Sequence, residues 1–136
     1  MKVLVDTVVW SLALRRKSRV QQADNATELT SLVQDGRVAM IGPIRQEILS
    51  GVKERAQFER LREYLRAFPD EAITPQDYEE AAMFFNQCRA RGIQGSNTDF
   101  LICAIAVRNE FSIFTNDRDF ENFAKVLPIV LYQTKA

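Results

Sequence analysis

The sequence predicts an α/β fold in which a central parallel sheet of about five short strands is covered by helices on both faces. The first observation is that short apolar segments alternate along the chain with longer segments of helical periodicity. The second is that the short segments are largely apolar, as strands buried between helical layers are. The third is the length of 136 residues with 46 % hydrophobic residues, which fits one domain, residues 1–136, around a single core.

The first half of the chain begins with a strand. Residues 2–5 form a buried strand pattern, and residues 7–14 are apolar all round, which indicates a short buried helix. A capping box formed by Asn25 and Glu28 is expected to start the next helix, and Gly36 ends it. The further elements of this half are a strand at 38–41, a helix from Pro43 through Ser50, and a charged helix with its inner stripe at Phe58, Leu61, Leu65 and Phe68.

The second half continues the alternation. Thr74, Pro75 and Asp77 start a helix that runs to Gly92. The elements expected after it are a helix at 98–109 and two strands at 112–115 and 129–132. Ligands of parallel sheets of this kind bind beyond the carboxyl ends of the strands. The residues that follow the strands are therefore the first candidates for a functional site.

The charge of the chain is balanced, because 18 Lys and Arg residues match 18 Asp and Glu residues. A protein of this composition that binds nucleic acid needs its positive charge gathered locally. Two such groups are present, one of four residues and one of two, although a solvated loop is the alternative interpretation of such a run. The groups are Arg15, Arg16, Lys17 and Arg19, and then Arg89 and Arg91.

The absence of histidine excludes the general acid–base catalysis that this side chain usually provides near neutral pH. It also excludes zinc sites built on histidine. The two cysteines, Cys88 and Cys103, form no CxxC pair, and we expect both to be reduced and structural. An enzyme of this composition would depend on carboxylates and a hard cation.

The sequence gives no sign of membrane attachment. No segment is apolar over the length that a membrane span needs. Residues 1–6 fit a strand better than a signal peptide, because a charged residue precedes any extended apolar run. We therefore expect a cytoplasmic location.

Three aspartates lie where strands or helices end. Asp6 directly follows the strand at 2–5, and Asp117 follows the strand at 112–115. Asp99 opens a helix whose next eight residues carry no polar side chain. Each position also has a structural interpretation: a helix cap for Asp6, a turn for Asp117 and a favourable interaction with the helix dipole for Asp99. Asp119, two residues further on, is an alternative to Asp117.

Asp99 is less easily explained as a cap, because Ser96, Asn97 and Thr98 precede it and already offer capping side chains. A helix start at this point therefore does not require Asp99. This increases the weight of a functional interpretation for its carboxylate.

A fourth acid, Glu47, lies within the helix that Pro43 opens. Ile44 and Ile48 centre the buried stripe of that helix, and Glu47 falls about 60° to one side of it. Gly51 shares this side and leaves space above the carboxylate, although an ordinary boundary glutamate is the alternative interpretation. Carboxylates that cluster repel one another unless a cation neutralises them, and oxygen ligands suit Mg²⁺ or Mn²⁺.

These four acids occur in segments that match a known family. The segments are VDTVVW with Asp6, RQEIL with Glu47, TDFLICAIA with Asp99 and TNDRDF with Asp117. In their order and spacing, which span almost the whole chain, the sequence resembles PIN-domain proteins, most closely the VapC toxins of toxin–antitoxin pairs. The resemblance implies a Rossmann-like sandwich with Asp6, Glu47, Asp99 and Asp117 as catalytic metal ligands. It also implies hydroxyl groups near the first and fourth acids, where this chain has Thr7 and Thr115.

The same resemblance implies an activity and partners. It implies an endoribonuclease dependent on Mg²⁺ or Mn²⁺ that hydrolyses a structured tRNA or rRNA, a homodimer, and a cognate VapB-type antitoxin. A haloacid-dehalogenase-type enzyme is disfavoured because Val8 stands where its second aspartate is needed. A response-regulator receiver is disfavoured because neither the paired acids near the first strand nor a late lysine is found. A non-catalytic PIN module that binds RNA or protein remains as the alternative, although such modules usually lose acids that this chain keeps.

Overall fold

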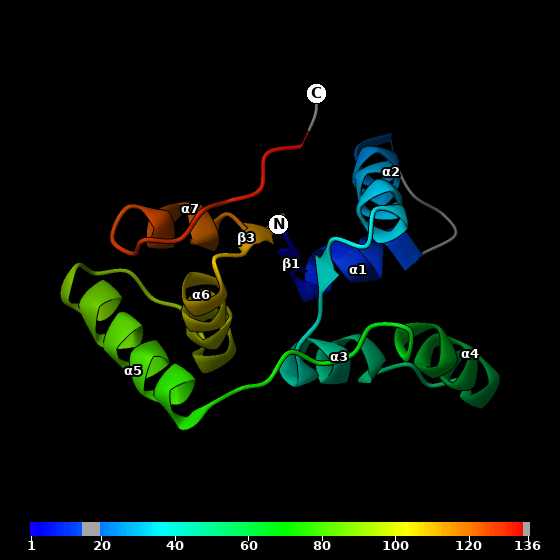
Figure 1. The fold of residues 1–136 in the computed structure, drawn as a ribbon, viewed down its shortest axis with the longest axis horizontal. Coiled ribbons are helices and arrows are strands. Elements are labelled where there is room, and N and C mark those ends of the chain that lie inside the picture. Colours follow the sequence, from blue (N-terminus) through cyan, green and yellow to red (C-terminus); the bar gives the residue numbers. More distant parts are fainter. Residues whose placement is uncertain (15–19, 135–136) are drawn as a thin grey trace.

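A computed structural model of the protein describes residues 1–14 and 20–134. The described chain alternates strands with helices, as the sequence predicts (Figure 1). In chain order the elements are β1 (Val3–Val5), α1 (Thr7–Leu14), α2 (Val20–Gln34), β2 (Val38–Ala39), α3 (Gly42–Leu49), α4 (Arg55–Leu65), α5 (Pro75–Ala90), α6 (Asn97–Asn109), β3 (Ser112–Phe114) and α7 (Asp119–Ala124).

The sheet of the described chain has three parallel strands in the order β2-β1-β3, so the prediction of about five strands is wrong. Residues 129–132 contribute only a single parallel bridge, between Leu131 and Ile113. The backbone N–H of Tyr132 still donates to the carbonyl of Ile113 at 2.8 Å, and its hydroxyl donates a hydrogen bond to Glu28 on α2. At the other edge, Asp70 forms a single bridge with Met40. Both extra segments therefore pair through one residue each.

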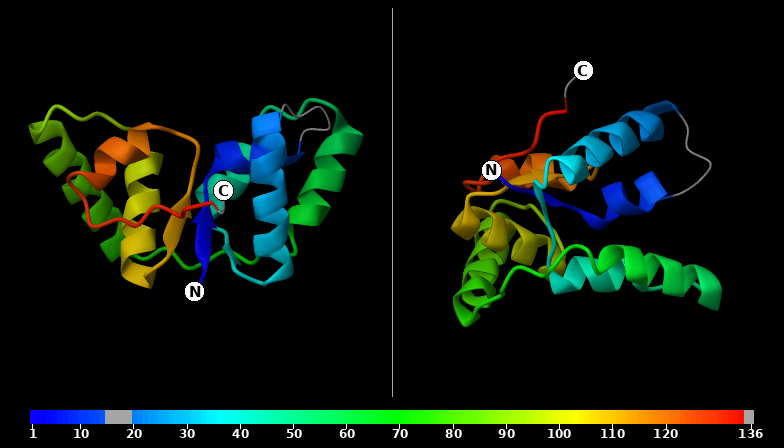
Figure 2. Two further views of the ribbon diagram at one scale, coloured as in Figure 1. Left: turned by 90° about the horizontal axis from the view of Figure 1, so that it is seen from above. Right: turned by 45° about the vertical axis from the view of Figure 1, so that its right-hand side comes forward.

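Helices flank the strands on two sides. Figure 1 and the left view of Figure 2 place α5, α6 and α7 on one side of the strands, and α1, α2 and α4 on the other. β1 is the central strand, and all three of its residues are buried. The residues that follow β1 and β3 therefore emerge side by side at the carboxyl edge of the sheet.

Two predictions about the first helices are wrong. α2 begins at Val20, so Asn25 and Glu28 lie inside this helix instead of capping it. α1 is not buried all round, because Val8 is 43 % and Leu14 38 % exposed. The predicted end of α2 is confirmed, since Gly36 has a φ of 67°, a conformation that glycine adopts at helix ends.

The helix α6 forms the centre of the core, with every residue from 100 to 106 buried. Its far end is held by Arg108, which donates hydrogen bonds of 2.6 and 2.9 Å to the buried carboxylate of Asp77 at the start of α5.

Cys88 and Cys103 are free and buried, as predicted, and burial raises the pKa of both thiols. None of the helices in the described ranges combines the length and the apolar character that crossing a membrane requires.

Candidate active site

The four acids that the sequence singles out line one pocket. Asp6 comes from the end of β1, Glu47 from α3, Asp99 from the first turn of α6, and Asp117 from the loop after β3. The pocket has a volume of about 480 Å³. Its remaining lining residues are Thr7, Val8, Gln46 and Ser50. Val8, Gln46 and Ser50 were not predicted, although Gln46 adjoins Glu47 on α3 and Ser50 caps the end of that helix.

Asp6 is the most buried of the four acids, at 6 % exposed. Its backbone N–H continues the β1–β3 ladder by donating to the carbonyl of Phe114 at 2.9 Å. Its carboxylate accepts hydrogen bonds from the backbone N–H of Thr7 at 2.8 Å and from the hydroxyl of Thr115 at 2.9 Å. Burial raises the pKa of Asp6 and the two hydrogen bonds lower it, while the charges of Asp99 and Asp117 raise it further. Hydrogen bonds therefore hold the carboxylate of Asp6 in place, and no Lys or Arg of the described residues pairs with it.

Asp99 lies in the first turn of α6 and has a structural role that the sequence analysis underestimated. Ser96 caps the helix, and Asp99 completes a capping box with it through two hydrogen bonds of 3.1 Å. Only Oδ2 of Asp99 takes part, and Oδ1 accepts no hydrogen bond from the described chain. Burial raises the pKa of Asp99, hydrogen bonds from Ser96 lower it, and the charges of Asp117 and Asp119 raise it. The capping box thus orients the carboxylate and leaves one oxygen free for a ligand.

Asp117 occupies a turn between β3 and α7. Its backbone N–H donates to the hydroxyl of Thr115 at 3.0 Å, and its Oδ1 accepts a hydrogen bond from the backbone N–H of Asp119 at 2.9 Å. The turn predicted as the structural interpretation is therefore present, and Asp117 also lines the pocket. Asp119 is exposed, starts α7 and does not line the pocket.

Glu47 and Thr7 meet across the pocket. Ile44 and Ile48 are buried, as the helix phase predicts, and Glu47 is exposed on the side facing α1. Its Oε1 accepts a hydrogen bond of 2.8 Å from the hydroxyl of Thr7. Together with the bond from Thr115 to Asp6, this contact means that both predicted hydroxyl residues hold a carboxylate of the pocket.

The loop before Asp99 packs tightly against α7. A Cβ added at Gly95 would lie 2.5 Å from the ring of Phe123 and 3.0 Å from the ring of Phe100. The two rings also contact each other, with centroids 4.8 Å apart. Only glycine therefore allows this approach between the segment that carries Asp99 and the helix that follows Asp117.

The chemistry of these side chains fits a hard divalent cation. All four are carboxylates, and no Lys or Arg in the described ranges forms an ion pair with any of them. Burial is the main cause of the raised pKa of Asp6, and the charges of Asp99 and Asp117 raise it further, with no cation from the described residues to offset them. Among the residues with described side chains, no three acids already lie close enough to share one ion, so binding would draw the carboxylates together.

Of the predicted basic residues that the structure describes, neither Arg89 nor Arg91 lines this pocket. Arg89 borders a separate hollow with Phe85 and Gln94. The cluster of Arg15, Arg16, Lys17 and Arg19 lies outside the described residues. Arg118, which was not predicted as a binding residue, is a basic residue directly beside Asp117 of the pocket.

A model of the PIN-domain family matches residues 3–126. The chain belongs to the PIN-domain family. A VapC ribonuclease of Mycobacterium bovis is 30 % identical over 131 residues, which cover 91 % of this chain and 92 % of the relative. Ribonuclease VapC11 of Mycobacterium tuberculosis matches with the same identity and coverage. The resemblance to VapC toxins is thereby confirmed.

Solved structures show the same PIN fold. FitAcB from Neisseria gonorrhoeae superposes with a TM-score of 0.77 at 17 % identity, covering 97 % of each chain. VapBC2 from Rickettsia felis, bound to a promoter DNA fragment, superposes with a TM-score of 0.75 at 17 % identity and covers 97 % of this chain and 98 % of that one. At this identity the likeness concerns the fold of this PIN domain alone.

Proposed function

We propose that this PIN domain is an endoribonuclease dependent on Mg²⁺ or Mn²⁺ and the toxin of a toxin–antitoxin pair. The observation that carries the proposal is the convergence of four carboxylates, without a basic partner from the described chain, in one pocket at the carboxyl edge of the sheet. The ribonuclease names of the 30 % identical relatives support an RNA substrate, for which tRNA or rRNA is the expected class.

In the proposed mechanism, Asp6, Asp99 and Asp117 would hold the ion, and Glu47 would bind it or orient the attacking water. A divalent cation held there would lower the pKa of that water and would stabilise negative charge on the scissile phosphate. Thr115 and Thr7 keep Asp6 and Glu47 in place through their hydroxyl groups. Ser96 does the same for Asp99 through its backbone N–H. Attack by water leaves a 5′-phosphate and a 3′-hydroxyl.

The partners follow from the same proposal. A VapB-type antitoxin is the expected inhibitor, in keeping with the VapBC2 assembly from Rickettsia felis among the structural relatives. We also propose that the toxin is a homodimer. A small open reading frame next to the gene for this chain would identify the antitoxin directly.

Two measurements test the proposed function. Purified protein should cleave RNA with Mg²⁺ or Mn²⁺ and stop when EDTA is added, and Asp99→Asn should abolish cleavage without unfolding the protein. Expression of the wild type alone should arrest growth of a bacterial host, whereas expression of Asp99→Asn should not. Cleavage that persists in excess chelator contradicts the mechanism. Normal growth with abundant folded wild-type protein favours the alternative of a non-catalytic binding module.

A further inference from the structure

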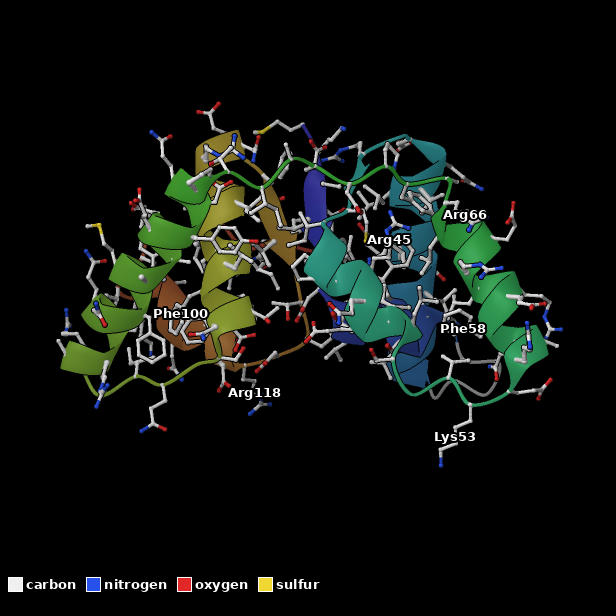
Figure 3. All side chains as sticks on the ribbon, turned by 90° about the horizontal axis from the view of Figure 1, so that it is seen from below. Arg45, Lys53, Phe58, Arg66, Phe100 and Arg118 are labelled. Atoms are coloured by element: carbon white, nitrogen blue, oxygen red, sulfur yellow. The ribbon has the colours of Figure 1, made fainter. Side chains whose placement is uncertain are left out.

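We propose that Arg118 binds a phosphate of the RNA strand next to the one that the four acids act on. The inference rests on the proposed function, since it assigns a residue to substrate binding at the same pocket. Arg118 immediately follows Asp117, which lines the pocket, and precedes α7. Figure 3 shows its side chain extending beyond the ribbon at the edge of the molecule.

The guanidinium of Arg118 is unpaired although a carboxylate stands on either side of it in the sequence. The structure shows no ion pair within 4.0 Å between Arg118 and Asp117, Asp119 or any other described acid. One reason lies in the turn itself, where Oδ1 of Asp117 accepts the backbone N–H of Asp119 and is thereby held toward α7. The side chain of Arg118 is thus exposed to solvent and pairs with no carboxylate of the described residues.

Three other arginines near carboxylates form ion pairs. Arg45 pairs with Asp70 at 2.9 Å, Arg108 with Asp77 at 2.6 Å and Arg55 with Glu59 at 3.1 Å. Arg118, like the exposed Arg60 on α4, has no such partner among the described residues. What distinguishes Arg118 is its position next to Asp117 of the pocket, where its guanidinium is available to an anionic ligand.

A phosphate group is the anion that best fits the position of Arg118. Four carboxylates repel a polyanionic strand, so a cation at the rim offsets part of that repulsion and fixes the strand. Arginine suits this task because its planar donors match phosphate oxygens in pairs. The Cα atoms of Arg118 and Asp117 are about 3.8 Å apart across one peptide bond, so the backbone brings Arg118 to the rim of the pocket that Asp117 lines.

The experiment compares Arg118→Gln with Arg60→Gln. Arg60 lies on α4, away from the pocket, and is also exposed and without an ion pair in the described chain, so it matches the charge change. A third variant, Arg118→Lys, keeps the charge without the paired donors. Binding of a fluorescein-labelled single-stranded RNA of about 12 nucleotides is measured by anisotropy in EDTA, where no cleavage occurs, over a range of NaCl concentrations. Thermal unfolding of each variant confirms that the fold is intact.

We expect Arg118→Gln to weaken RNA binding about tenfold at low salt, the size of one charge-assisted hydrogen bond. Its plot of log affinity against log salt concentration should be shallower by about 0.7, which corresponds to one phosphate contact on a single strand. Arg60→Gln should match the wild type, and Arg118→Lys should keep the wild-type salt slope. Equal affinity and slope for Arg118→Gln and Arg60→Gln overturn the inference, as does a wild type that does not bind RNA at all.

Cleavage assays with Mg²⁺ separate this inference from the proposed function. A wild type that binds RNA through Arg118 but cleaves none refutes the nuclease and leaves Arg118 as a binding residue. A wild type that cleaves RNA, together with an Arg118→Gln variant of unchanged KM and unchanged salt dependence, refutes the role of Arg118 alone.

Discussion

The hydroxyl of Thr7 donates a hydrogen bond to Oε1 of Glu47, 40 positions later in the chain, at 2.8 Å. Thr7 begins α1 directly after Asp6, so the contact ties Glu47 to the residue next to the most buried acid of the pocket. Glu47 is exposed, and without this bond its carboxylate would be free to sample several rotamers. The position of the mid-helix acid thus depends on a neighbour in another element.

Thr7→Val should lower the cleavage rate about tenfold, because one hydrogen bond to a charged group, of about 1.5 kcal/mol, would no longer orient Glu47. Thr7→Ser keeps the hydroxyl and should retain most of the rate. Thr30→Val, an exposed position on α2, is the matched control for the change in side-chain type. Single-turnover cleavage of one RNA at saturating Mg²⁺ measures all three. A Thr7→Val rate equal to that of Thr30→Val would show that the contact has no role in orienting Glu47.

Asp6→Asn should raise the melting temperature of the metal-free protein at neutral pH, although it abolishes cleavage. The folded-state pKa of Asp6 is raised by burial and by the charges of Asp99 and Asp117, so the charged form is unfavourable in the metal-free fold. The stability contributed by protonated Asp6 is present at low pH and is lost as the pH rises through this raised pKa.

The same cluster explains the expected effect of metal. Adding Mg²⁺ should raise the melting temperature of the wild type and have a much smaller effect on Asp6→Asn, since an ion that binds only the folded state stabilises it. Asp35→Asn, at an exposed site, serves as the control for removal of one negative charge. Thermal unfolding with and without Mg²⁺ is the measurement. Equal Mg²⁺ shifts in all three proteins would place the ion elsewhere.

Asp117→Asn should reduce the cleavage rate by at least about 10²-fold, or about 2.7 kcal/mol of transition-state stabilisation, whereas Asp119→Asn should cost about tenfold or less. The reason is that Asp117 lines the pocket, while the side chain of Asp119 is exposed at the start of α7 and acts on Asp99 through its charge. The backbone N–H with which Asp119 bonds Asp117 is kept in Asp119→Asn. Both rates are compared at saturating Mg²⁺. The reverse ranking would transfer the fourth site to Asp119.

Asp77→Asn should lower the free energy of unfolding at neutral pH by about 2 kcal/mol, since Arg108 would lose a charge-assisted hydrogen bond. The hydrogen bond from Arg108 lowers the pKa of Asp77 below its ordinary value of 3.8. The stabilisation is therefore present above that ordinary value and is lost as the pH falls through the lowered pKa.

Urea unfolding at several pH values checks this prediction. The difference between wild type and Asp77→Asn should be constant above about pH 5 and shrink in acid. A difference that stays constant down to the acid-unfolding range would show that the ionised carboxylate is not what stabilises the two helices.

The sequence was sufficient to predict which acids line the same pocket, because strand direction and helix phase determine where these residues lie. Asp6 and Asp117 follow parallel strands, and parallel strands end at one edge. Glu47 was placed by the phase of its helix relative to Ile44 and Ile48, both of which are buried. These relationships depend on periodicity and strand direction, which the residue pattern carries.

Other features depend on contacts that the pattern does not carry. Residues 129–132 are apolar enough for a strand, but only Leu131 forms a bridge, and the hydroxyl of Tyr132 bonds to Glu28 on α2. The start of α2 was predicted too late in the chain, because Asn25 and Glu28 have the spacing of a capping box although both lie inside the helix. The free guanidinium of Arg118 could not be predicted, since two adjacent acids suggest a neutralised arginine.

The close approach at Gly95 links two acids that sequence distance separates. Any side chain there would push against Phe123 of α7 and Phe100 of α6 together. Asp99 follows Gly95 by four residues, and Asp117 precedes α7 by two. A single methyl group at position 95 would therefore displace the segments that carry Asp99 and Asp117 together. The arrangement of the acids in this PIN domain thus depends on a residue that does not itself line the pocket.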